Sequence, residues 1–203
     1  MTTLHIPDLS LVLLVGVTGS GKSTFAARHF GPYETLSSDT CRAWVSDDPD
    51  DQSATADAFA VLEFIAARRL RAGRLTVVDA TNVQPAARKA FVALAREHDV
   101  LPVALVLDVP ETVCAARTSA RSDRTFGRDV VRRQHQQLTR SLRGLAREGF
   151  RTVHVLTPEE IENATIVRDP LRSDLRDRQG PFDVVGDVHG CLGELHTLLT
   201  TLG

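Results

Sequence analysis

The chain has 203 residues, a formal net charge of −2, 42% hydrophobic residues and 25% charged residues. Such a length suits one α/β domain with a buried core, and the composition is that of an ordinary globular protein. No apolar run approaches the ~18 residues of a membrane span, and no signal segment opens the chain. The three cysteines, Cys41, Cys114 and Cys191, form no C-x-x-C pair, which argues against disulfides or a zinc site and favours the reducing cytoplasm.

Short apolar segments alternate with segments of helical period along the first 156 residues. Strands are expected at 11–16, 33–37, 75–79, 101–108 and 151–156, and helices at 22–30, 53–72, 84–99, 110–122 and 128–147. This alternation predicts an α/β fold with a parallel five-stranded sheet and helices on both faces. The runs at 75–79 and 103–107 are apolar enough for central strands.

Residues 11–24 predict a strand, a glycine-rich turn and the start of a helix. From Gly16 to Ser23 they match G-x-x-x-x-G-K-[ST], the P-loop that holds the phosphates of a nucleoside triphosphate. Backbone N–H groups and the positive end of the helix converge on the polyphosphate. Lys22 is expected to reach the β- and γ-phosphates, and the Ser23 hydroxyl to bind Mg²⁺. The predicted nucleotide-binding residues of this loop are Gly16, Thr18, Gly19, Ser20, Gly21, Lys22, Ser23 and Thr24.

Two charged residues follow the second expected strand. Asp39 stands at a strand's carboxyl end, where a carboxylate facing the P-loop can accept a proton from an acceptor hydroxyl. Arg42 lies on the same helical face and is a candidate to hold a phosphate of the acceptor. Alternatively, Asp39 caps a helix that begins near Thr40, and Arg42 only pairs with it. The presence of the P-loop favours the catalytic interpretation.

Asp79 ends the third expected strand and has the position of a Walker-B-type acid. Such a carboxylate orders Mg²⁺ directly or through a water molecule. Thr81 and Asn82 follow it, and they either touch the nucleotide or only form the turn before Pro85.

Residues 117–151 contain ten arginines and three acidic residues. Arg117, Arg121, Arg124 and Arg128 recur at the spacing of one helical face. Such a run is usually a solvated surface. It nevertheless follows the fourth expected strand, where P-loop kinases carry a lid whose arginines neutralise the transferred phosphoryl group. We therefore predict a P-loop kinase fold with an arginine-bearing lid.

The composition changes after residue 163. We expect a kinase domain at 1–163, a charged linker at 164–181 and the truncated start of another domain at 182–203, with a strand and a turn followed by a helix at 192–202. In that last segment Asp187 and His189 form a D-x-H-G pattern, which can supply the first ligands of a two-metal centre. The remaining ligands of such a centre are absent, so the two residues are expected to bind metal only in a full-length protein.

Four features of the sequence together carry a resemblance to a known family: residues 16–23, 37–42 and 78–82, and the spacing Arg117-x₃-Arg121-x₂-Arg124. They resemble the kinase domain of bacterial polynucleotide kinase-phosphatases, which repair RNA. Residues 180–191 are similar to the start of that family's metallophosphoesterase module. The resemblance covers residues 8–203. It implies transfer of the γ-phosphate of ATP, or another NTP, to the 5′-hydroxyl end of RNA or DNA, with Mg²⁺ as the metal. It also implies a cytoplasmic, multi-module repair enzyme and is compatible with a homodimer at full length.

The resemblance also implies roles for individual residues. Lys22 binds phosphates, Ser23 the metal, and Asp39 is the general base. Arg42 orients the acceptor's phosphate. The lid would contain Arg121 and Arg124, and Arg117 matches the start of the same pattern.

Two other functions fit the residues alone. A small-molecule kinase of the gluconate, shikimate or toxin type shares the P-loop, the acid and an arginine lid. A non-catalytic ATP-sensing module that regulates an adjoining phosphoesterase would need only the P-loop, and it leaves Asp39 and Arg42 without a purpose.

Overall fold

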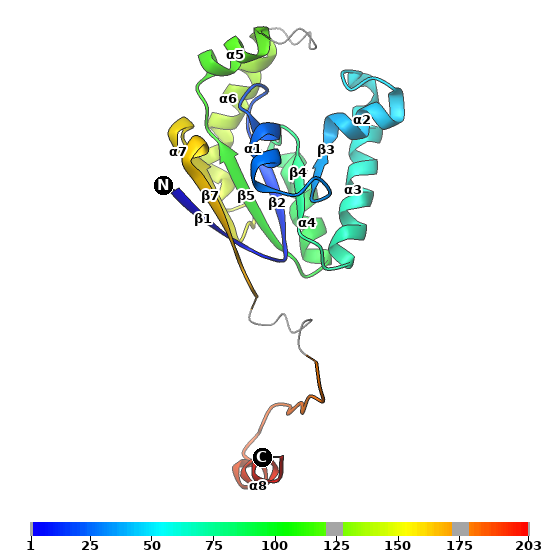
Figure 1. Ribbon diagram of the computed structural model, residues 1–203, viewed down its shortest axis with the longest axis vertical. Helices are drawn as coiled ribbons and strands as arrows, with labels where there is room; N and C mark the ends of the chain where they lie inside the picture. Colours follow the sequence, from blue (N-terminus) through cyan, green and yellow to red (C-terminus); the bar gives the residue numbers. More distant parts are fainter. Residues whose placement is uncertain (1, 121–127, 172–178, 203) are drawn as a thin grey trace. The chain divides into compact units, whose positions relative to one another are not determined.

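The computed structural model describes residues 2–120, 128–171 and 179–202, and the chain divides into two compact units, Met1–Leu171 and Arg172–Gly203 (Figure 1). The elements in chain order are β1 (Thr2–Pro7), β2 (Ser10–Val15), α1 (Lys22–His29), β3 (Thr35–Ser37), α2 (Ser38–Ser46), the 3₁₀ turn η1 (Gln52–Ala54), α3 (Thr55–Arg71), β4 (Thr76–Asp79), α4 (Pro85–Glu97), β5 (Leu101–Leu107), α5 (Glu111–Ser119), α6 (Arg128–Leu145), β6 (Thr152–Leu156), α7 (Pro158–Asn163), β7 (Ala164–Asp169) and α8 (Leu192–Leu202).

The first unit is built on a five-stranded parallel sheet with the order β3-β4-β2-β5-β6. Every residue of the central strand β2 is buried, and its Leu13 pairs with Val78 on one side and Ala104 on the other. A parallel strand covered on both faces reads as a continuous apolar run, which is why β2, β4 and β5 could be placed from the sequence. Figure 1 shows α1 in front of the sheet and α4 and α6 behind it. The predicted α/β fold is confirmed.

The strand order explains where a ligand can bind. From β2 the chain goes to the edge strand β3, returns to β4, and then crosses β2 to reach β5. In such sheets a crevice opens beyond the carboxyl ends of the strands, where the direction of winding reverses. Here that crevice lies above β2 and β4.

A second, two-stranded sheet was not expected. β1 and β7 pair in parallel, with Leu4 opposite Ile166, and β1 buries Leu4 and Ile6 in the core. Residues 164–169 are therefore a strand of the first unit, and their assignment to a linker is wrong. The partners lie about 160 residues apart in sequence, so neither six-residue strand carried a local sign of the pairing.

The second unit contains the expected helix α8. The strand expected just before it is not formed within the described residues 179–191. An isolated strand leaves its backbone N–H and C=O groups without a ladder partner, so an apolar run alone does not produce one. Within the described parts of the chain, no helix is both long enough and apolar enough to cross a membrane.

Candidate active site

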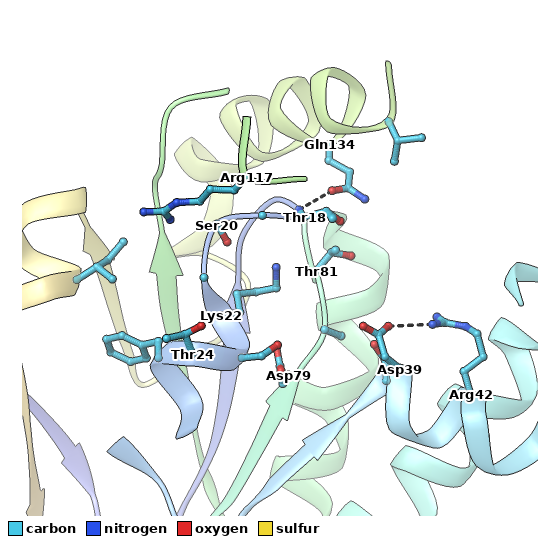
Figure 2. A pocket seen from close by; sticks show the side chains of 18 of the residues that line it. Thr18, Ser20, Lys22, Thr24, Asp39, Arg42, Asp79, Thr81, Arg117 and Gln134 are labelled. Carbon is cyan, nitrogen blue, oxygen red and sulfur yellow. Dashed lines mark hydrogen bonds and ion pairs between the residues drawn. The ribbon is translucent and has the colours of Figure 1, made fainter. Parts of the chain in front are cut away.

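A pocket of about 460 Å³ opens at the carboxyl ends of the strands of the first unit. Its lining brings together the loop after β2, the start of α2, the end of β4, one residue of α5 and the beginning of α6 (Figure 2). Of the predicted site residues, those that line it are Thr18, Gly19, Ser20, Gly21, Lys22, Ser23, Thr24, Asp39, Arg42, Asp79 and Arg117. Gly16 lies at the base of the loop and is not part of the lining.

The loop between β2 and α1 has the backbone that its glycines allow. Gly19 and Gly21 have φ values of +84° and +92°, a region that L side chains rarely adopt. A Cβ on Gly19 would also lie 2.5 Å from the carbonyl oxygen of Cys114, so α5 packs directly against the loop. The N-terminus of α1 has no side-chain cap, which leaves its first N–H groups directed at the pocket.

Lys22 is held across this loop. Its buried ammonium group donates to the carbonyl oxygens of Gly16 (2.9 Å) and Val17 (3.0 Å), which curls the side chain over the loop as Figure 2 shows. The only positive side chain within the loop therefore stands beside its N–H groups, and an anion bound there would meet both.

The loop is fastened to the neighbouring strand from below. The Gly16 N–H donates to the carbonyl oxygen of Thr81 (3.0 Å), and the Asn82 side chain donates to the carbonyl oxygen of Leu14 (2.9 Å). Arg88 of α4, which is fully buried, donates to the carbonyl oxygen of Asn82 (2.7 Å). These bonds fix the end of β2 relative to the residues that follow Asp79.

Asp39 and Arg42 lie on the first turns of α2. Ser37 caps this helix, because its hydroxyl accepts the N–H of Thr40 (3.4 Å). The alternative in which Asp39 is the cap is therefore wrong, and its carboxylate lines the pocket instead. The pairing that belongs to the same alternative is present, since Arg42 donates to Asp39 (2.9 Å).

Arg42 is oriented from two sides. It also donates to the carbonyl oxygen of Pro49 (2.8 Å), and its side chain is only 7% exposed. A buried guanidinium fixed in this way has a defined direction and keeps part of its donor set at the pocket wall. The Arg42 Nε, which is buried, has no hydrogen-bond partner among the described residues.

The oxygen donors that suit Mg²⁺ are a hydroxyl and a carboxylate. Ser23 and Asp79 both line the pocket, and Asp79 is 6% exposed at the end of β4. Mg²⁺ is commonly held by one or two such groups together with substrate phosphates and waters. No cluster of three or more His, Cys, Asp or Glu that would hold a metal by itself occurs in the described part of the chain. The donor set therefore fits a metal that arrives with a nucleotide.

Two of the four arginines predicted to share one helical face, Arg117 and Arg128, lie on different helices. Arg117 is on α5 and lines the pocket, whereas Arg128 begins α6. The prediction of a shared helical face is therefore wrong for Arg117 and Arg128. Arg121 and Arg124 lie outside the described residues.

Sequence reasoning missed Gln134. Its side-chain oxygen accepts the N–H of Thr18 (2.8 Å), so α6 contacts the phosphate loop directly (Figure 2). The two residues are 116 positions apart, and no local pattern indicates the contact. The sequence also gave no sign that α7 lines part of the pocket. Its Glu162 accepts hydrogen bonds from Arg28 of α1.

Cys114 lies under the loop without taking part in the pocket. Burial raises the pKa of its thiol, against the opposing effect of the Lys22 and Arg117 charges. Because the thiolate is the reactive form, this shift favours the less reactive protonated thiol.

The fold and the site together define a P-loop kinase fold, and the comparison with known proteins agrees with this class. The chain belongs to the AAA_33 family, described as an AAA domain, whose model matches residues 11–145. No curated protein sequence matches the chain.

Three solved structures share the fold. A chain of the Pnkp1/Rnl/Hen1 RNA repair complex superposes with a TM-score of 0.58 at 22% identity, covering 68% of this chain and 46% of that one. The AvrRxo1-ORF1:-ORF2 complex with ATP gives 0.56 at 15% identity, covering 74% and 55%. A proposed kinase from Chloroflexus aurantiacus gives 0.52 at 16% identity, covering 77% and 94%. The chain thus spans about half the length of the matched chains in the two complexes.

Proposed function

We propose that this chain is an ATP-dependent polynucleotide 5′-hydroxyl kinase acting in nucleic-acid end repair. The observation that carries the proposal is that Asp39 and Arg42 line the same pocket as the phosphate loop while a different residue caps their helix. A nucleotide sensor needs the loop but has no use for a carboxylate and a guanidinium opposite it. The likeness of the fold to a chain of an RNA repair complex favours a polynucleotide acceptor.

In the proposed reaction the γ-phosphoryl group leaves the β-phosphate oxygen of ATP and joins the 5′-oxygen of the acceptor in line. The loop N–H groups and Lys22 hold the phosphates, and Asp39 aligns the 5′-hydroxyl and takes its proton. Ser23 and Asp79 would hold Mg²⁺, which would supply positive charge to the bound phosphates. Arg117, with Arg121 and Arg124 of the lid, would neutralise charge on the transferred group.

Arg42 gives the acceptor its position. When a nucleotide with a 3′-phosphate enters, the guanidinium can bind that phosphate while Asp39 faces the 5′-hydroxyl of the same nucleotide. An acceptor without this phosphate loses that contact. A polynucleotide end is therefore a better substrate than a free nucleoside, and this difference separates the proposal from a small-molecule kinase.

The test uses γ-labelled ATP, Mg²⁺ and a panel of acceptors. We expect label to appear on 5′-hydroxyl RNA or DNA oligonucleotides, with much weaker transfer to nucleosides and none to gluconate or shikimate. Transfer to a small alcohol but not to an oligonucleotide would overturn the polynucleotide assignment. Binding of ATP without transfer to any acceptor would instead support the sensing module.

A further inference from the structure

One aromatic ring lines the pocket among polar side chains. Phe59 stands on α3 four residues after Thr55, so the two side chains lie on one face of that helix, and both line the pocket. Among the described lining residues the only other aromatic side chain is Phe25, which is 2% exposed and has no open face. Phe59 has no role in holding phosphates or in moving a proton, so its presence in this lining calls for another ligand group.

The wall that contains Phe59 lies on the acceptor side of the pocket. The elements α2, η1 and α3 follow one another in the chain, and α2 and α3 pack side by side (Figure 1). Figure 2 shows Asp39 and Arg42 on one side of Lys22, and Thr24 and Arg117 on the other. In an in-line transfer the acceptor oxygen and the leaving oxygen stand on opposite sides of the phosphorus. With Asp39 as the base, the acceptor therefore occupies the side of α2 and α3, and the nucleoside of ATP extends away from Phe59.

The Phe59 ring is supported by the core but not enclosed by it. It packs against the buried ring of Phe91 on α4, with the ring centroids 6.4 Å apart and the planes at 47°. Phe59 itself is only partly buried, and its uncovered part belongs to the pocket lining. The contact with Phe91 restricts the orientation of the ring, so little side-chain freedom remains to be lost when a ligand covers it.

The chemistry of this wall suits a nucleotide better than a small polyhydroxy acid. The carboxylate of Asp39 and the guanidinium of Arg42 can bind a hydroxyl and a phosphate, which both kinds of acceptor can carry. An aromatic face adds affinity only for a ligand with a flat apolar part of its own. In a nucleotide that part is the base.

We propose that Phe59 stacks on the base of the acceptor's first nucleotide. This inference rests on the proposed function and adds a recognised group beyond the 5′-hydroxyl and the 3′-phosphate. Because every base has a π-face, stacking of this kind selects a nucleotide without selecting its sequence. Phe59 is thus a specificity-determining residue that separates polynucleotide ends from other alcohols.

A binding experiment tests the stacking without any turnover. The affinity for a 3′-labelled 5′-hydroxyl trinucleotide is measured by fluorescence anisotropy, and the same strand with an abasic first sugar is compared with it. In the wild type, loss of the first base should weaken binding by about tenfold, a value within the range of one base–aromatic stack. In Phe59→Leu, which keeps an apolar side chain against Phe91 but has no flat face, both strands should bind equally and as weakly as the abasic strand binds to the wild type.

Two further variants are the controls. Phe59→Tyr keeps the ring and should keep the effect of the base. Phe64→Leu changes an aromatic residue of the same helix that is 60% exposed and outside the pocket lining, and it should bind both strands as the wild type does. The affinity of Phe59→Leu for ATP should equal that of the wild type, because the ring lies on the acceptor side. No effect of the base in the wild type, an undiminished effect in Phe59→Leu, or an equal loss of ATP affinity in that variant would overturn the stacking.

Kinetics separate this inference from the proposed function. Transfer of label from ATP to the trinucleotide and to its abasic form with equal KM would overturn the stacking while leaving the kinase intact. Base-dependent binding that Phe59→Leu abolishes, without transfer to any acceptor, would refute the kinase assignment and support the stacking.

Discussion

Removing the ion pair between Arg88 and Glu148 tests whether these buried side chains support the phosphate loop. Arg88 is fully buried and donates to both carboxylate oxygens of Glu148 (2.7 and 2.5 Å) and to the carbonyl oxygen of Asn82 (2.7 Å). Glu148 is 17% exposed. Truncating Arg88 to alanine leaves a largely buried carboxylate and a buried carbonyl without their donor.

Breaking a buried pair of this kind costs about 3–5 kcal/mol of the free energy of unfolding. In a unit of this size each kcal/mol lowers Tm by roughly 2–4 °C, so Arg88→Ala should melt about 6–20 °C below the wild type. Glu148→Ala should cost a similar amount because it leaves the guanidinium unpaired. The double variant should lose much less than the sum, since each single change already removes the interaction.

Urea and thermal unfolding of the wild type, both single variants and the double variant give the coupling energy. Lys89→Ala, a change at an exposed neighbour on α4, is the matched control and should be close to neutral. A loss below about 1 kcal/mol for Arg88→Ala, or strictly additive losses, would show that the pair does not support the loop. Nucleotide affinity should fall in Arg88→Ala as well, because Asn82 links this pair to the end of β2.

Three further outcomes are expected. Gly19→Ala should lower the affinity for ATP more than tenfold, because the φ of +84° and the lack of space for a Cβ both oppose alanine. The measurement is a titration with a fluorescent nucleotide, and the control is Gly144→Ala, where no atom lies within 4 Å of the added Cβ. Hydrogen bonds from Arg168 lower the pKa of Glu34, so Arg168→Ala should cost about 1 kcal/mol of the free energy of unfolding at pH 7. In urea unfolding, the difference in stability between the variant and the wild type should shrink as the pH falls below 4.5, because Glu34 becomes protonated. A difference that does not depend on pH would contradict this pairing. Gln134→Ala should raise the KM for ATP severalfold with little change in Tm, and an equal effect of exposed Gln136→Ala would exclude a specific contact.

The sheet and the phosphate loop could be predicted from the sequence because their signals are local. Buried parallel strands are continuous apolar runs, and the loop pattern specifies its own turn through Gly19 and Gly21. The positions of Asp39 and Asp79 at strand ends then followed from the rule that such ends meet at one edge of the sheet.

Other features depended on contacts that no local pattern records. The pairing of β1 with β7 and the bond between Gln134 and Thr18 each join distant parts of the chain. The alternative in which Asp39 caps α2 was wrong for a different reason. Ser37, Asp39 and Thr40 are all good capping residues, and only the backbone conformation decides which of them is the cap. Two separate helices were expected at 110–122 and 128–147, but the arginine spacing continues from one to the other and so wrongly indicated a common face for Arg117 and Arg128.

The most direct test of the central claim is a comparison of binding and transfer in Asp39→Asn. Asparagine keeps the size of the side chain and its bond to Arg42 but is no base, so ATP affinity should be retained while transfer to a 5′-hydroxyl oligonucleotide falls by about 10²–10⁴ in a single-turnover assay. Asp57→Asn, at an exposed acid on α3, should retain full activity. If Asp39→Asn transferred phosphate at a rate within a few fold of the wild type, Asp39 would not be the base and the proposed mechanism would be wrong.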